Sequence, residues 1–196
     1  MPIGTISRGR KKVAEGKWIP VKKGTKKPIL TYSLKSSVKK AEDSIVDLDY
    51  ERCFIFDATG KILLSKNGSE DRIEFTGGEM VKFKGAEVLT HNHPGSESFS
   101  PEDIQMAWIC GFREMRVVGP KYDYSVKIAG KWSLETWNKF VDKLDEVDKE
   151  VRDYILPKLY AKAIPMEEAN VMHWHRVWTF MAKQVDSFKY SRRVKK

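Results

Sequence analysis

The alternation of apolar and polar positions predicts a chain that mixes strands with helices. Residues 52–56 and 61–65 are largely apolar and are separated by the turn sequence Asp-Ala-Thr-Gly at 57–60, which is typical of a β-hairpin. The segment at 86–90 is apolar along most of its length and ends beside two histidines. Further strands are expected at residues 72–75, 114–118 and 124–128.

Helical spacing of apolar residues marks four other segments. A short helix is expected at 34–48, and another at 100–110, where Gly111 would supply the C-terminal cap. From residue 134 the apolar residues recur every three or four positions until Pro157, which is expected to end or kink that helix. A last helix is expected at 166–185. This order predicts an α+β or α/β fold, with a mixed sheet flanked by helices and a helical C-terminal layer.

Charge divides the chain into three parts. Residues 1–40 contain 12 lysines and arginines against one acid, Glu15, and residues 187–196 add five basic residues and no acid, within a total of +9. Together with the predicted elements, this distribution gives a basic arm at 1–33, a folded domain at 34–132 and a helical extension with a basic tail at 133–196. Such ends are suited to nucleic acid, an acidic partner or an assembly surface, but solvated tails without a partner fit equally well.

Two further features indicate a cytoplasmic protein. No apolar run approaches the ~20 residues that would cross a bilayer, and the first residues lack the apolar stretch of a secretory signal. Cys53 and Cys110 lie among apolar residues, which favours buried free thiols over a disulfide.

Residues 90–103, T-H-N-H-P-G-S-E-S-F-S-P-E-D, carry the strongest chemical signal. Side chains two positions apart on a strand share a face, so His91 and His93 can point to one place. Pro94 then breaks the strand, Ser100 fits a helix N-cap, and Asp103 in the first turn can reach back toward the histidines. Two imidazoles, one carboxylate and an open fourth position are the ligands of a catalytic zinc site.

Each part of this motif has a simpler interpretation. Asp103 can be the acid of a capping box, and histidines occur on exposed strands without any function. The combination favours a metal, because two of the chain's four histidines fall in this one motif. His173 and His175 repeat the spacing within a helical pattern, where side chains two positions apart point about 200° apart. We therefore expect the helical pair to lie beside a core stripe formed by Trp174, Val177, Trp178 and Met181.

The pattern H-x-H-P followed by S-x-x-D resembles the JAB/JAMM (MPN+) metalloproteases, which include deubiquitinating isopeptidases and RadC-like proteins. The sequence at 90–104 is especially similar to JAB-like domains of phages, some of which are C-terminal parts of MuF-type head-morphogenesis proteins. The resemblance spans about residues 43–128, and it implies a cytidine-deaminase-like fold. For a phage protein it implies a location in the host cytoplasm or the virion.

The resemblance also implies roles for individual residues. His91, His93 and Asp103 would bind Zn²⁺, Glu51 would be the general acid/base, and Ser100 would donate a hydrogen bond to the oxyanion. Nine residues separate His93 from Asp103, one fewer than is typical of the isopeptidases, so Ser98 competes with Ser100 for that last role. Without the resemblance, Glu51 is one exposed acid among many at a strand start.

Three functions remain open at this point. The resemblance favours a zinc-dependent peptidase or isopeptidase, in which metal-activated water attacks an amide carbonyl of a ubiquitin-like conjugate or a phage structural protein. A second hypothesis is an assembly module of a phage particle that retains the JAB fold. A third is a nucleic-acid-associated protein that binds through its basic arms.

Overall fold

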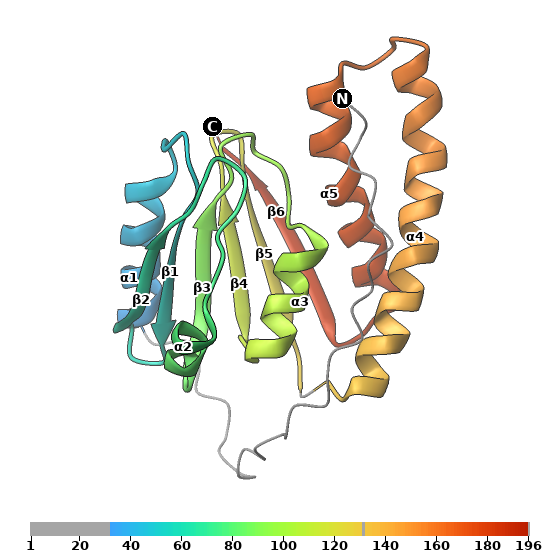
Figure 1. Ribbon diagram of the computed structural model, residues 1–196. Helices are drawn as coiled ribbons and strands as arrows, with labels where there is room; N and C mark the ends of the chain where they lie inside the picture. Colours follow the sequence, from blue (N-terminus) through green and yellow to red (C-terminus); the bar gives the residue numbers. More distant parts are fainter. Residues whose placement is uncertain (1–31, 131, 196) are drawn as a thin grey trace.

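A six-stranded mixed sheet organises the protein, with strand order β2-β1-β3-β4-β5-β6 (Figure 1). The computed structural model describes residues 32–130 and 132–195, so most of the basic arm predicted at 1–33 lies outside the described residues. The strands are β1 Arg52–Asp57, β2 Ile62–Asn67, β3 Ala86–Asn92, β4 Glu114–Val118, β5 Tyr122–Ile128 and β6 Phe188–Val194. The helices are α1 Tyr32–Ile45, α2 Gly77–Met80, the 3₁₀ helix η1 Val81–Phe83, α3 Pro101–Cys110, α4 Leu134–Tyr160 and α5 Met166–Gln184.

The parallel pair β3–β4 determines where the two ends of the motif at 90–103 meet. All other neighbouring strands in the sheet are antiparallel, whereas β3 and β4 run parallel with Leu89 opposite Met115 and His91 opposite Val117. A parallel pair needs a crossover, and α3 forms part of this one. The crossover leaves the end of β3 through the loop at 93–100 and returns over the sheet, which brings the start of α3 back toward β3.

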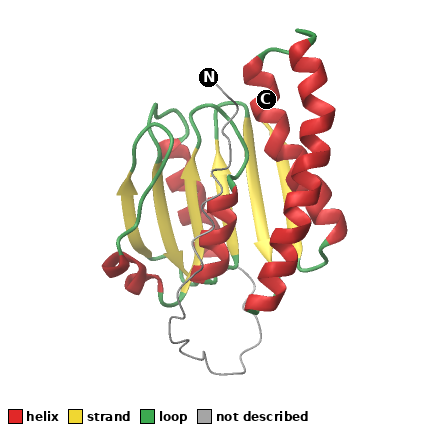
Figure 2. Cartoon of the chain, turned by 45° about the vertical axis from the view of Figure 1, so that its right-hand side comes forward, coloured by secondary structure: helices red, strands yellow, loops and turns green. Residues whose placement is uncertain are grey.

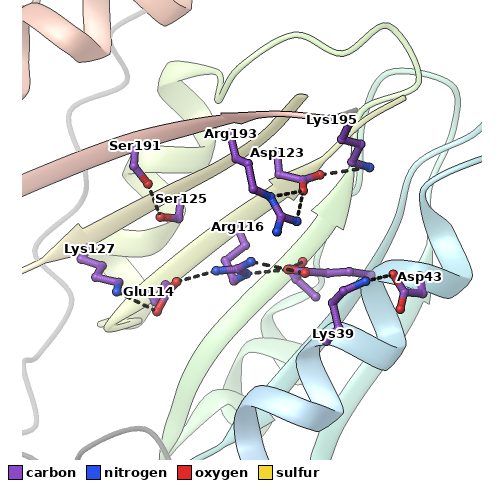
Figure 3. Close-up of polar contacts among 12 residues, drawn as sticks. Lys39, Asp43, Glu114, Arg116, Asp123, Ser125, Lys127, Ser191, Arg193 and Lys195 are labelled. Atoms are coloured by element: carbon purple, nitrogen blue, oxygen red, sulfur yellow. Dashed lines mark hydrogen bonds and ion pairs between the residues drawn. The ribbon is translucent and has the colours of Figure 1, made fainter. Parts of the chain in front are cut away.

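Helices cover both faces of the sheet, but unequally (Figure 2). On one face α3 and the antiparallel pair α4 and α5 enclose the main core, in which Phe140, Val147 and Trp178 pack with sheet residues such as Val117 and Phe188. On the other face α1 is the one described helix, and it packs against β1 and β3 through a smaller core that includes Leu34, Ile45, Phe54 and Val88. Beyond α1 that second face is polar over β4, β5 and β6 (Figure 3).

Most predicted elements are confirmed, including the mixed α+β class, the C-terminal helical pair and the cap at Gly111, which has a left-handed φ of 68°. The predicted strand at 72–75 is wrong, because this segment forms a loop in which Ile73 and Phe75 are only partly buried. Of the two alternatives for Pro157, an end or a kink of the helix, the end is wrong, since α4 continues to Tyr160 with the proline inside it.

The C-terminal basic segment is the largest correction. A basic tail was expected, but β6 pairs with β5 along its whole length, from Phe188 opposite Ile128 to Val194 opposite Tyr122. Phe188 is buried in the main core, while the basic residue Arg193 lies on the polar face. The tail is therefore an edge strand with one apolar and one charged face. Among residues 32–130 and 132–195, no helix combines the length and apolar character needed to cross a membrane.

Candidate metal centre

Strand β3 brings the two histidines of the motif together. His91 lies in the strand and His93 directly follows its last residue. As predicted from the alternation of side chains, both imidazoles point to the same side of the sheet, and their Nε2 atoms are 3.0 Å apart. His91 is only 3% exposed, so its Nε2 is shielded from bulk water on most sides.

Asp103 has two roles at once, one in the helix and one beside the histidines. It forms a capping box with Ser100, in which Oδ2 of Asp103 accepts hydrogen bonds from the Ser100 backbone N–H at 2.8 Å and from its hydroxyl at 3.0 Å. At the same time Oδ1 of Asp103 is 3.4 Å from His91 Nε2, and Oδ2 is 3.8 Å from His93 Nε2. The structural and the metal-binding interpretations of Asp103 are therefore compatible.

The arrangement of these three side chains fits a zinc ion. One ligand atom from each of His91, His93 and Asp103 lies within 4.8 Å of the others. Tetrahedral ligands with Zn–N distances of 2.0–2.1 Å are separated by about 3.3 Å, which is close to the separations above. Two imidazoles and one carboxylate are also the donor set of catalytic zinc sites, which keep one position open.

Glu51 lies at the edge of the same group, immediately before β1. Its Oε1 is 3.5 Å from His93 Nε2, and the residue is only 7% exposed. The loop after β2 fixes its backbone, because the Glu51 N–H donates to the Ser69 carbonyl and the Gly68 N–H donates to the Glu51 carbonyl, both at 2.7 Å. Burial raises the pKa of Glu51 to about 7, although the neighbouring His91 opposes this shift. A carboxyl group of this kind can both accept and donate a proton near neutral pH.

Asn92 was not identified from the sequence, yet it fixes the position of Glu51. Its side chain is turned away from the histidines and is fully buried. The amide oxygen accepts from the Arg52 backbone N–H at 2.7 Å, and the amide nitrogen donates to the Tyr50 carbonyl at 2.8 Å. Asn92 thus ties the end of β3 to the residues on both sides of Glu51. The alternation of the strand predicted its direction, but no local pattern predicted its partners.

The two histidines differ in protonation, and the neutral form of His93 suits metal binding. Burial of its ring lowers the pKa of His93 to about 4, and the adjacent His91 adds to this effect. His93 Nδ1 lies 3.1 Å from the Glu97 carbonyl oxygen, to which it donates, so the lone pair of Nε2 faces the centre. For His91, burial opposes the charged form, but the Asp103 carboxylate outweighs it and the pKa is raised. His91 Nδ1 is buried and has no hydrogen-bond partner among the described residues.

The loop that carries Glu97 is fixed to the turn between β4 and β5. Ser96 adopts a left-handed φ of 64°, and its hydroxyl accepts from the Lys121 backbone N–H at 3.0 Å. The Tyr124 hydroxyl donates to the Ser96 carbonyl at 2.9 Å. Gly119 lies so close that an added Cβ would meet the His93 carbonyl oxygen at 2.9 Å. A side chain at position 119 would therefore displace the loop that carries His93.

The C-terminal helices and β6 hold the same loop from the other side. The Ser98 hydroxyl is 2.9 Å from the Tyr190 hydroxyl, which in turn lies 2.9 Å from His175 Nδ1. The Trp178 indole N–H donates to the Phe99 carbonyl at 2.7 Å. Ser98 is 2% exposed and faces Tyr190, whereas the Ser100 hydroxyl lies against Asp103. Of the two hydroxyl groups, that of Ser100 contacts the candidate ligand Asp103, whereas that of Ser98 contacts Tyr190.

The second histidine pair has separate partners, as the helical spacing predicted. His173 Nε2 is 2.8 Å from Oδ1 of the buried Asp148, which also pairs with Arg152 at 2.7 Å. His175 points to Tyr190. Cys53 and Cys110 are free thiols, and burial raises the pKa of Cys53 to about 12. Neither thiol belongs to the group that could hold a metal.

Compared with known protein families, with curated proteins and with solved structures, the chain matches none of them.

Proposed function

We propose that the protein is a zinc-dependent hydrolase of the JAB/JAMM type, a peptidase or isopeptidase that acts on an amide bond of a protein substrate. The observation that carries the proposal is the convergence of His91, His93 and Asp103, with the carboxyl group of Glu51 3.5 Å from His93 Nε2. Structural histidines on a strand do not require a buried acid beside them, whereas a metal-assisted hydrolase requires both ligands and a proton carrier. The motif that resembles phage-type members supplies the family name.

His91, His93 and Asp103 would hold the ion, through Nε2 of each imidazole and the Asp103 carboxylate. When bound, zinc supplies Lewis-acid polarisation of a carbonyl oxygen and lowers the pKa of water to about 7. Oε1 of Glu51 would accept a proton from the attacking water and return it to the leaving amine. Burial strengthens these electrostatic interactions, because little solvent screens them.

Ser100 would stabilise the oxyanion through its hydroxyl group. In the structure this hydroxyl donates to Asp103 Oδ2 at 3.0 Å. To donate to a substrate it must rotate away from Asp103, which keeps the Ser100 backbone N–H as a partner at 2.8 Å. The exchange therefore leaves the capping box partly intact. Removal of one oxyanion donor typically costs about 10²–10³ in rate.

Metal content is the first test of this proposal. The wild-type protein, purified without added metal and measured by elemental mass spectrometry, should contain about one zinc per chain. The double variant His91→Ala/His93→Ala should contain none. If the wild-type protein lacks zinc and does not take it up, the hydrolase proposal fails and an assembly module that retains the fold becomes the better hypothesis.

Hydrolysis is tested with Glu51→Gln, which keeps the shape of the side chain but cannot carry the proton. The variant should bind zinc like the wild-type protein and lose at least 10²-fold in the rate of peptide cleavage. Glu150→Gln is the matched control, because Glu150 is an exposed acid on α4 that borders neither the candidate metal centre nor Glu51. Equal activity of Glu51→Gln and wild type would contradict the mechanism.

A second function, binding of nucleic acid, is favoured by the polar face of the sheet (Figure 3). Lys127 and Lys189 stand directly opposite each other on β5 and β6, an arrangement that like charges disfavour. Further along the same two strands Arg193 and Lys195 both pair with Asp123, which is 6% exposed, and Lys127 itself lies 3.6 Å from Glu114, so cations outnumber acids here. An anionic backbone laid over this face would relieve the repulsion between the lysines.

This second function predicts binding of single- or double-stranded nucleic acid that weakens steeply with salt. Lys127→Glu/Lys189→Glu should abolish it, whereas a variant with the same charge change on α4, Lys139→Glu/Lys143→Glu, should not. Affinity that ignores the salt concentration would eliminate this function without affecting the hydrolase proposal.

A further inference from the structure

An apolar recess of about 100 Å³ opens directly beside the candidate metal centre. The buried residues Cys53, Leu89 and Met115 line it from the sheet, and Met106 lines it from α3. Ile73 and Phe75 line it from the loop after β2, the segment that does not join the sheet. Glu51, Glu102, His91 and Asp103 also border the recess, so it shares its mouth with the candidate metal centre.

The register of the sheet places the recess one step along β3 from the ligands. Leu89 and His91 are two residues apart on the strand and therefore face the same side, about 6.7 Å from each other along its axis. Met115 stands opposite Leu89 on β4, and Cys53 stands opposite His91 on β1. A side chain attached to a residue whose carbonyl lies at the metal centre spans this distance. The recess is thus positioned for the residue beside the bond that is cut.

We propose that the recess receives a neutral aliphatic side chain, of the size of valine, leucine or methionine, from the substrate residue next to the scissile amide. This proposal rests on the proposed amide hydrolysis. A cavity of about 150 Å³ lined by apolar side chains accommodates benzene, so a recess of 100 Å³ suits a branched or linear group of three or four carbons and is too small for an aromatic ring.

The charges around the recess further restrict the side chains that it can accept. The titratable acids that border the recess are Glu51, Glu102 and Asp103, and no lysine or arginine lines it within the described part of the chain. An acidic side chain would meet carboxylates at the mouth and would lose its hydration on the apolar lining. Glycine or alanine would leave that lining uncovered, and each missing methylene in such a pocket lowers kcat/KM by about 10-fold or more.

Met106 is the position at which the recess can be changed without touching a ligand or Glu51. It lies one turn along α3 from Asp103 and is partly buried. Met106→Ala enlarges the recess, and Met106→Trp fills it. Met172→Ala is the matched control, because Met172 on α5 is also a partly buried methionine at the main core but does not line the recess.

The test uses peptides that differ only in the residues beside the cleaved bond, which are Gly, Ala, Leu, Met, Phe or Asp. Cleavage by the zinc-loaded protein is followed by mass spectrometry. Binding of the same peptides to Glu51→Gln is measured by calorimetry, as a readout that does not depend on catalysis. Leu and Met peptides should exceed Gly, Phe and Asp peptides by at least 10-fold in both measurements. Met106→Trp should shift the preference to Gly and Ala, Met106→Ala should admit Phe, and Met172→Ala should leave the preference for Leu.

The failures of the two proposals are distinguishable. Cleavage with no side-chain preference, or a preference that Met106→Trp and Met106→Ala leave unchanged, overturns the recess proposal and leaves the hydrolase standing. Selective binding of Leu peptides that depends on Met106, without cleavage by the wild-type protein, supports the recess and overturns the hydrolase. Absence of both binding and cleavage overturns both proposals.

Discussion

The protein contains two His-x-His pairs, and the backbone gives them opposite surroundings. On β3 the imidazoles of His91 and His93 meet with their Nε2 atoms 3.0 Å apart. On α5 the rings of His173 and His175 turn to different partners, the carboxylate of Asp148 and the hydroxyl of Tyr190. Identical spacing therefore produces a shared centre where side chains repeat every two residues, and two separate contacts where they repeat every 3.6.

Removal of metal is expected to give the largest difference between variants of the two histidine pairs. Chelation should lower the Tm of the wild-type protein, because a ligand that binds only the folded state stabilises it by about 4 kcal/mol at a free concentration 1,000 times its Kd. The variant His173→Ala/His175→Ala should show the same shift between zinc-loaded and chelated states from a lower starting Tm. His91→Ala/His93→Ala should show no shift, and differential scanning calorimetry measures all three. A shift that is lost in the helical variant instead would place the metal on α5.

The acids beside the two pairs should differ in what they support. Asp148 should matter for stability and Asp103 for zinc binding. Asp148→Ala removes the common partner of His173 and Arg152 from a site where Asp148 is 3% exposed, so the free energy of unfolding should fall by about 3 kcal/mol. Asp103→Ala should cost only about 1 kcal/mol in the metal-free protein, the usual value of a helix cap, but should abolish zinc binding. Urea unfolding of metal-free protein and zinc titration test both. Loss of zinc in Asp148→Ala with zinc retained in Asp103→Ala would contradict the assignment of the metal to the pair on β3.

Tyr190 links the two regions, since its hydroxyl lies between Ser98 and His175. Tyr190→Phe should lower the free energy of unfolding by about 1 kcal/mol, the usual net value of such hydrogen bonds. It should also weaken zinc binding severalfold, less than the 10–100-fold typical of a group that contacts a ligand directly. Tyr154→Phe, which removes an exposed hydroxyl that contacts Arg176 and Lys158, should do neither. Equal zinc affinity in Tyr190→Phe and wild type would show that the two regions are independent.

The smallest effect concerns pH and His175. Burial lowers the pKa of His175 to about 4, and Arg192 and Arg176 add to the shift. Because the unfolded chain keeps the ordinary value near 6.5, it binds the proton more readily between pH 6.5 and 4, so this contribution to stability is complete above pH 6.5 and falls as the pH drops toward 4. Since His175 is only half-buried, we expect a loss of about 1 kcal/mol between pH 7 and pH 5.

His175→Gln should remove this part of the pH dependence in metal-free protein. Contributions from His91 and His93 are common to both proteins and cancel in the difference. Parallel curves for His175→Gln and wild type would mean that His175 titrates equally in the folded and unfolded states.

Local pattern was sufficient for most of the elements and for the shared direction of the candidate ligands. The alternation of β3 predicted that His91 and His93 share a face, and the cap at Ser100 predicted that Asp103 lies in a first helical turn. These are relations between residues close in sequence. The apolar spacing of Phe140, Leu144 and Val147 likewise located α4 and its buried side.

Long-range partners could not be predicted in the same way. Asn92 forms hydrogen bonds with the backbone of residues 50 and 52, about 40 positions away. The sequence around an asparagine in a strand does not predict such distant partners. The strand β6 was interpreted as a tail, because its Lys and Arg residues outweighed the alternation of Phe188 and Tyr190. An edge strand with one solvated face and a solvated tail both carry charged residues, because their side chains contact water. Only the pairing with β5 distinguishes the two.

The position of β6 also has a consequence for the order in which the protein is made. A ribosome releases His91, His93 and Asp103 well before it releases Tyr190, whose hydroxyl contacts the loop between them. During that interval the nascent chain has its candidate metal ligands without β6, the strand that helps to hold their loop in place. Synthesis that stops before residue 188 would leave β5 as an unprotected edge and the loop without this support. Binding of a metal at the candidate ligands would then compete with binding of chaperones to the exposed edge of β5.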